Sequence, residues 1–107
     1  MPVVRCHAPR LRQLARRAGY RVYLVDGERV RNEIDTDFTM GGNPERYRYV
    51  PRGEIWIDEN LSPPDRRATI LHEIVETKHM KRGLSYEKAH DIATAAEARF
   101  RARRVRP

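Results

Sequence analysis

The sequence predicts an α+β protein in which a small, mostly antiparallel sheet packs against three helices. Two observations carry this prediction. Short segments rich in β-branched and aromatic residues, bounded by turn signals, lie before residue 58, and two clearly bounded helical segments follow them. A chain of 107 residues has room for one modest hydrophobic core, so we expect a single domain over residues 1–107.

A basic helix is expected near the N-terminus, over about residues 9–18. Apolar side chains recur there at the spacing of one helical face, and Gly19 follows as a stop signal. The residues that share this face are Leu11, Leu14, Ala15 and Ala18.

Two strand pairs are expected between this helix and residue 58. In residues 20–25, β-branched and aromatic residues alternate with others, which is typical of a strand. Asp26-Gly27 is a two-residue hairpin signal, so residues 28–34 are predicted to return as the partner strand. After a loop that contains Gly41-Gly42, the second pair is predicted at residues 47–50 and 54–58.

The two C-terminal helices have clear boundaries in the sequence. Ser62 is a typical N-cap residue with proline after it, and Gly83 supplies a C-terminal stop, so one helix is predicted from Ser62 to about residue 82. Ser85 can cap a second helix that runs from about Tyr86 to Arg103. The short turn between them predicts two antiparallel helices that lie side by side.

The stretch His72-Glu73-x-x-Glu76 carries the pattern that points to chemistry. His72 and Glu76 are four residues apart, so they project from one face of a helix and can hold one ion between them. Glu73 is rotated by about 100° from His72 and can reach a water on that ion. This is the spacing of an HExxH zinc helix in which Glu76 replaces the second histidine.

A site with one histidine and one glutamate needs a further protein ligand, and His90 on the returning helix is the leading candidate. His72, Glu76 and His90 are therefore predicted to bind a divalent ion, with Zn²⁺ expected and manganese, iron or nickel as alternatives. His79 is the rival ligand, because it lies on the same stripe of the first helix. Glu97 is either a further ligand or an acceptor that orients a histidine. Alternatively, Glu73 and Glu76 pair with Lys78, Lys81 or Arg82 on a solvated face and bind no metal.

Charge is unevenly distributed along the chain. The formal net charge is +7, yet all fifteen carboxylates lie between Asp26 and Glu97. The N-terminal segment and the arginine-rich tail, about residues 99–107, are therefore candidates for contact with nucleic acid or another polyanion. No stretch approaches the roughly 20 apolar residues of a membrane span. With a single cysteine, Cys6, and no recognisable signal peptide, we expect a cytoplasmic protein without a membrane partner.

The region from about Tyr47 to Glu97 resembles the minimal zincin metallopeptidases, including the ImmA/IrrE-like group. The resemblance rests on Gly53-Glu-Ile-Trp-Ile-Asp58 as an edge strand, followed by a short loop and the helix that bears His72-Glu73. The chain is still more similar to small phage or prophage-type proteins in which an HExxE helix precedes a Tyr-x-x-Ala-His helix. Tyr86-Glu-Lys-Ala-His90 fits that second helix.

The resemblance implies a zinc-dependent hydrolase that acts on the peptide bonds of a peptide or protein substrate. His72, Glu76 and His90 would hold the zinc, and Glu73 would be the general base that takes a proton from zinc-bound water. Glu76 departs from the zincin pattern, and its extra carboxylate makes the ion a weaker Lewis acid. Two other hypotheses stay open: a binding module that contacts nucleic acid through its basic ends, and a metal-free zincin fold that binds a protein partner.

Overall fold

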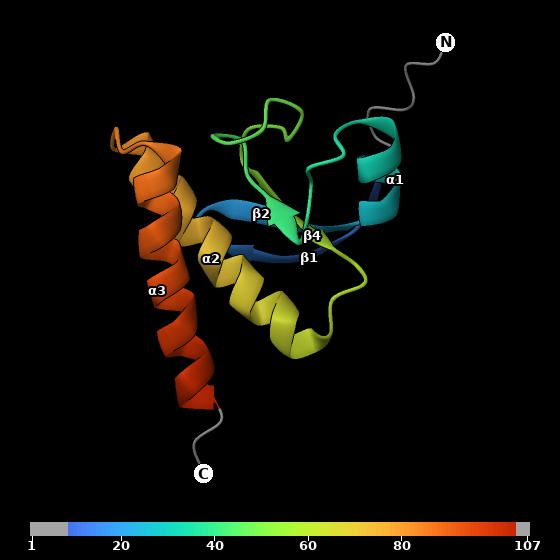
Figure 1. The fold of residues 1–107 in the computed structure, drawn as a ribbon. Coiled ribbons are helices and arrows are strands. Elements are labelled where there is room, and N and C mark those ends of the chain that lie inside the picture. Colours follow the sequence, from blue (N-terminus) through green and yellow to red (C-terminus); the bar gives the residue numbers. More distant parts are fainter. Residues whose placement is uncertain (1–8, 105–107) are drawn as a thin grey trace.

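Four strands and three helices make up residues 9–104, the part of the chain that the computed structural model describes (Figure 1). The strands are β1 (Arg10–Arg17), β2 (Tyr20–Val25), β3 (Gly41–Gly42) and β4 (Glu54–Asp58). The helices are α1 (Gly27–Glu33), α2 (Pro63–Lys81) and α3 (Tyr86–Arg104). The predicted α+β class and the strands at residues 20–25 and 54–58 are confirmed. None of these helices is long and apolar enough to cross a membrane.

The sheet is mixed, with the strand order β1-β2-β4-β3. Its central strands, β2 and β4, run parallel, and β1 and β3 are added antiparallel on the outer sides. Parallel neighbours need a crossover connection, and here it runs through α1 and β3. The strand that precedes α2 is therefore a central strand, and the prediction that residues 53–58 form an edge strand is wrong.

The basic segment at residues 10–17 is a strand, and not the helix predicted over residues 9–18. Two register shifts in the pairing of this strand with β2 interrupt the alternation of inward and outward side chains. The apolar residues of the segment therefore recur at a spacing that resembles one face of a helix. Ala18 and Gly19 turn the chain into β2 with positive φ values of 51° and 87°. Pairing with the open side of β2 outweighs the local helical pattern, as tertiary context often does.

Asp26-Gly27 does not form the predicted hairpin, and residues 28–34 do not return as a strand. Asp26 is the N-cap of α1, because its carboxylate accepts a hydrogen bond from the backbone N–H of Arg29 at 3.1 Å. Gly27 lies so close to Asp58 that a Cβ at this position would clash with the carboxylate. The absence of a side chain at Gly27 thus allows α1 to pack closely against the end of β4, and Gly27 does not belong to a two-residue turn.

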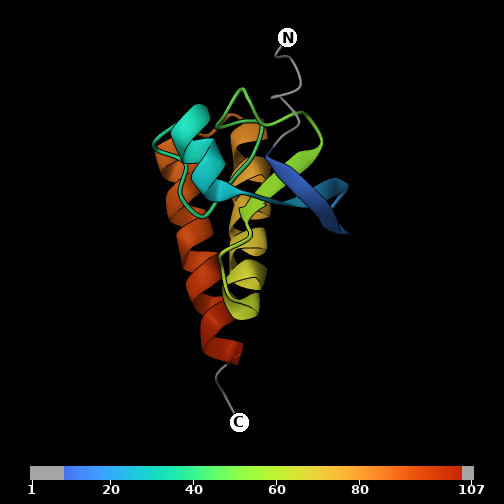
Figure 2. The same cartoon turned by 90° about the vertical axis from the view of Figure 1, so that its right-hand side faces the viewer.

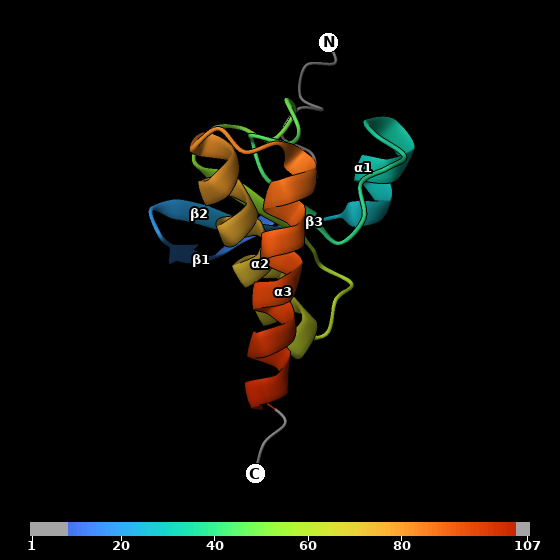
Figure 3. The same ribbon diagram turned by 60° about the vertical axis from the view of Figure 1, so that its left-hand side comes forward.

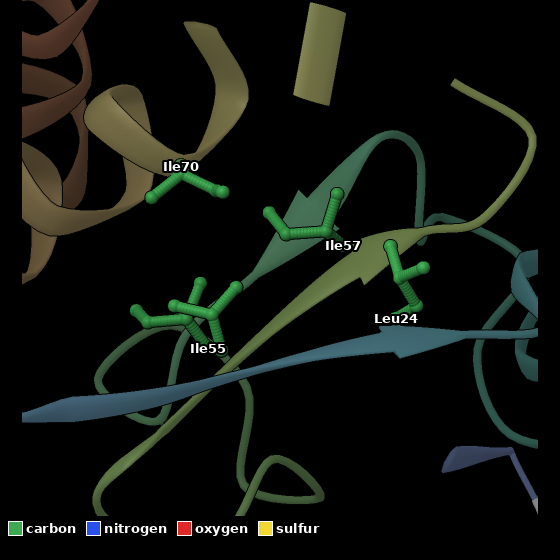
Figure 4. Packing of buried hydrophobic residues seen from close by; sticks show 5 residues of the cluster. Leu24, Ile55, Ile57 and Ile70 are labelled. Atoms are coloured by element: carbon green, nitrogen blue, oxygen red, sulfur yellow. The ribbon is translucent and has the colours of Figure 1, made fainter. Parts of the chain in front are cut away.

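Two apolar clusters cover the two faces of the sheet. The cluster between the sheet and α2 consists of Val22, Leu24, Ile55, Ile57 and Ile70 (Figure 4). The cluster on the opposite face consists of Val25, Val30, Phe38, Val50 and Trp56. Tyr47 and Tyr49 pack against the second cluster with ring centroids 5.0 Å apart. Residues 47–50, predicted to be a strand, form turns that hold these rings.

Helices α2 and α3 follow their predicted boundaries closely. Ser62 caps α2, accepting a hydrogen bond from the Asp65 N–H at 3.4 Å, and Gly83 follows its end with a φ of 102°. The two helices lie side by side and antiparallel (Figures 1 and 2). Figure 3 shows α3 outside α2, with the sheet on the far side of α2. Helix α2 is therefore the middle layer between the sheet and α3.

The two basic ends are described in part. The predicted tail at residues 99–107 continues α3 as far as Arg104, and residues 105–107 lie outside the described part. Residues 1–8, with Cys6 among them, also lie outside it.

Candidate metal centre in the cleft beside α2

The three side chains predicted to be metal ligands meet between α2 and α3. His72 Nε2 lies 3.2 Å from Glu76 Oε2 and 3.2 Å from His90 Nδ1. Glu76 Oε2 lies 2.8 Å from His90 Nδ1, so the three atoms form a nearly equilateral triangle. Tetrahedral zinc with bonds of about 2.0–2.1 Å separates its ligand atoms by about 3.3 Å. The triangle thus has the size of one face of such a site, and this group could hold a metal ion.

The rival ligand, His79, is not brought to this group. Its Nδ1 lies 2.9 Å from the backbone carbonyl oxygen of Val75, one turn earlier in the same helix. The residues of the described chain that the structure brings together are His72, Glu76 and His90. Helix α2 supplies two of them from successive turns, and the tight turn after Gly83 places His90 opposite them, as the sequence predicted.

Glu97 occupies the position of an acceptor that orients His72. Its Oε1 lies 3.0 Å from His72 Nδ1, where it can accept a hydrogen bond and hold the imidazole with Nε2 facing the group of ligands. Arg101 holds Glu97 in turn, donating to Glu97 Oε2 at 2.9 Å and to Asp65 Oδ1 at 2.7 Å. Arg101 was predicted to be part of a basic tail, but the structure uses its charge to support the site.

Asn43 is a residue of the site that the sequence analysis missed. Its side chain is completely buried, and its Oδ1 accepts hydrogen bonds from the backbone N–H groups of Glu45 and Arg46 at 2.9 and 3.0 Å. These two donors define which end of the amide is oxygen. Asn43 Nδ2 therefore donates to both glutamates, to Glu73 Oε1 at 2.9 Å and to Glu76 Oε1 at 3.0 Å. No spacing in the sequence relates residue 43 to α2, so only the fold could reveal this contact.

The two glutamates of the motif have opposite shifts in pKa. Burial and the neighbouring charge of Glu76 raise the pKa of Glu73 to about 7, against the opposing effect of the Asn43 hydrogen bond. Burial acts on Glu76 as well, but hydrogen bonds from His72 and His90 hold the pKa of its carboxyl below the usual range. Glu73 can thus take up and release a proton near neutral pH, while Glu76 stays ionised.

His72 has a raised pKa in the metal-free protein. Burial lowers it, but the hydrogen bond to Glu76 and the charges of Glu73, Glu76 and Glu97 outweigh the effect of burial. A proton on this imidazole competes with a metal ion for the same nitrogen, so metal affinity is expected to fall as the pH falls.

The ligand group lies in the wall of a cleft of about 220 Å³. One side of the cleft is formed by α2 and α3, and the other by the segment that leads through β3 and the turn after it. From that second side come Thr39, Met40, Gly41, Arg46 and Tyr47. Because β3 is the edge strand here, its backbone, and not that of β4, lies at the lip of the cleft.

Comparisons with known proteins assign no family to the chain. No family model, no curated protein and no solved structure matches it. The resemblance to minimal zincins therefore stays a prediction, and the functional argument rests on the geometry of the site.

Proposed function

We propose that the protein is a metal-dependent hydrolase of peptide bonds, with zinc bound by His72, Glu76 and His90 and with Glu73 as the general base. The observation that carries the proposal is the triangle of ligand atoms, 2.8 to 3.2 Å on a side, in the wall of a cleft beside a buried carboxyl group. A buried carboxyl of this kind, next to possible metal ligands, is typical of a catalytic site. At other positions in a protein, burying a carboxyl group only destabilises the fold.

The donor set fits a catalytic zinc site better than a structural one. Two imidazole nitrogens and one carboxylate oxygen are the three-ligand set of many catalytic zinc ions, whereas structural sites are usually closed by four protein ligands. All three residues also line the cleft, so a substrate has access to them. A zinc ion bound there would supply a Lewis acid that polarises the substrate carbonyl and makes water more acidic.

The residues of the chain perform the positioning and the proton transfer. Asn43 binds Glu73 through Oε1, which leaves Glu73 Oε2 to accept a proton from the attacking water and to pass it to the leaving amine. The hydrogen bond to Glu97 holds the His72 ring, so that Nε2 faces the ligand group. Asn43 also holds Glu76 through Oε1 and keeps Oε2 directed at His90.

A peptide substrate is supported by the backbone at the lip of the cleft. Gly41 belongs to the edge strand β3, which pairs with β4 on one side. An extended peptide that adds to the outer side of an edge strand forms backbone hydrogen bonds that do not depend on its sequence. Gly41 lines the cleft together with the ligand group, so a peptide bound in this way would pass the site.

The test combines metal analysis with activity. Untagged protein should contain zinc close to one ion per chain by elemental mass spectrometry, and His90→Ala should lose it while the control His79→Ala keeps it. Glu73→Gln should keep the metal and lose hydrolysis of a mixed peptide library by at least about 100-fold, the usual scale of general base catalysis. A Glu73→Gln variant that loses the metal, or that hydrolyses peptides at the normal rate, would contradict the assigned roles.

A second candidate function, polyanion binding, is favoured by a separate groove on the opposite side of α2. Arg17 from β1 and Arg67 from α2, two basic residues distant in sequence, line this groove, and its other lining residues are the apolar Ile70, Leu71, Ile74 and Phe100. In this case nucleic acid affinity should fall steeply with salt and should not respond to a chelator. Absence of binding at low salt would exclude the polyanion hypothesis.

A further inference from the structure

Arg46 stands apart from the other residues of the cleft. Among the residues that line the cleft it is the one arginine or lysine, and Glu73, Glu76 and Glu97 line the same cleft. Nevertheless, none of the ion pairs found in residues 9–104 includes Arg46. Arg46 is exposed, and its guanidinium contacts aromatic rings and not the carboxylates of the cleft.

Aromatic rings hold the guanidinium. Its central carbon lies 3.9 Å from the ring centroid of Tyr86 and 5.4 Å from that of Tyr47. A guanidinium that stacks on a ring uses its flat face, and the N–H groups at its edge that do not bind the Tyr47 and Tyr86 hydroxyls stay available for a fork-shaped contact with a carboxylate. Tyr86 in turn lies beside the ligand group, with its hydroxyl 3.4 Å from His90 Nδ1.

The backbone of Arg46 is also fixed relative to the site. Its N–H donates to the side-chain oxygen of Asn43 at 3.0 Å, and the amide of the same Asn43 binds Glu73 and Glu76. One buried residue thus binds the backbone of the arginine and the carboxylates of both the base and a ligand. Such a shared anchor is typical of a binding element that must lie at a defined distance from the reacting bond.

We propose that Arg46 forms an anion subsite of the cleft, which binds a carboxylate of the substrate close to the bond that is cleaved. This inference rests on the proposed hydrolase function and adds a substrate class to it: peptides that carry a carboxylate next to the scissile bond. The carboxylate is either the free C-terminus of the peptide or an aspartate or glutamate side chain, and both present the same planar pair of oxygens to the guanidinium.

Three matched peptides separate these two sources. The first is N-acetyl-Gly-Leu with a free carboxylate, the second is its C-terminal amide, and the third is N-acetyl-Leu-Asp amide, whose one carboxylate is on a side chain. Binding is measured by NMR titration of the metal-free, full-length protein, because a bound metal would itself attract carboxylates. The variants are Arg46→Gln and the control Arg48→Gln, an exposed arginine two residues away that does not line the cleft.

We expect at least one of the two acidic peptides to bind about fivefold more tightly than the amide, the upper scale of an ion pair with an exposed arginine. The preference should disappear in Arg46→Gln and persist in Arg48→Gln. The acidic peptide that binds more tightly shows whether the subsite prefers a C-terminal or a side-chain carboxylate. Equal binding of all three peptides, or a preference that survives in Arg46→Gln, would overturn the proposal.

A parallel hydrolysis assay with zinc keeps this result separate from the proposed function. If the acidic peptides bind through Arg46 but zinc-loaded protein cleaves no peptide, the anion subsite stands and the hydrolase function fails. If peptides are cleaved without any preference for a carboxylate, the hydrolase function stands and the subsite fails.

Discussion

The two sides of helix α2 differ in the kind of interaction that they bury. On the side of the cleft, His72, Glu73 and Glu76 are buried together with hydrogen-bond partners from other parts of the chain. On the side of the sheet, Ile70 joins an apolar cluster, and Ile74 packs against that cluster. The apolar side stabilises the fold, whereas the polar side buries carboxyl groups at a cost in stability, as sites for chemistry commonly do.

The largest expected effect is the contrast between two substitutions, one on each side of α2. The His90 side chain is 44% exposed, so His90→Ala should remove zinc binding and change the free energy of unfolding by less than about 1 kcal/mol. Ile70→Ala should lower the free energy of unfolding of the metal-free protein by about 2–4 kcal/mol and leave the zinc content unchanged. Urea unfolding and metal analysis of both variants measure the two effects. Equal losses of metal in both variants would show that the two sides are not separable.

A second prediction concerns the cost of burying Glu73 in the metal-free protein. Its folded-state pKa, about 7, is above the ordinary value of 4.5, so the folded state binds the proton more tightly than the unfolded state does. Below pH 4.5, Glu73 is protonated in both the folded and the unfolded state, so its burial does not lower the free energy of unfolding. As the pH rises from 4.5 to 7, the unfolded state loses this proton more readily, and the free energy of unfolding falls. Glu73→Gln keeps the acceptor for Asn43 and removes the charge, so it should be more stable than the wild type above pH 7.

The expected gain in Glu73→Gln is on the order of 3 kcal/mol at most, from the size of the pKa difference. It should vanish near pH 4. Thermal unfolding of both chelator-treated proteins at several pH values measures it, with the exposed Glu87→Gln as the control. A pH-independent difference would mean that burial of the charge is not the cause.

The smallest expected effect lies in the support of His72 by Glu97. Glu97→Gln should weaken zinc affinity by about 10- to 100-fold, because outer partners orient the imidazole and raise its basicity without binding the ion. Saturating zinc should still give one ion per chain. A competition titration with a zinc indicator gives the affinity, and Glu87→Gln again is the control. Complete loss of zinc at saturation would make Glu97 a ligand, and unchanged affinity would leave it without a role in the site.

The C-terminal half was far more predictable than the N-terminal half. Ser62, Gly83 and the periodic apolar residues act within one helix or one turn, so the boundaries of α2 and α3 could be predicted from local signals. The spacing of His72 and Glu76 and the short turn after α2 then sufficed to place His90 opposite them. In the N-terminal half, β1 and α1 were assigned wrongly. The register shifts of β1 hide the alternation of a strand, and α1 packs through Val30 against residues that are distant in the sequence.

By itself, the sequence determined the helical hairpin and the residues that the hairpin brings together, because helical periodicity and capping are local properties of the chain. Tertiary structure alone decided the rest of the site. Asn43 reaches Glu73 and Glu76 because β3 pairs with β4 beside α2, and Arg101, one helical turn after Glu97, reaches Asp65 because α3 packs along α2. A hydrogen bond between segments thirty or more residues apart leaves no periodic trace in the sequence, so these supports of the site became visible only in the folded chain.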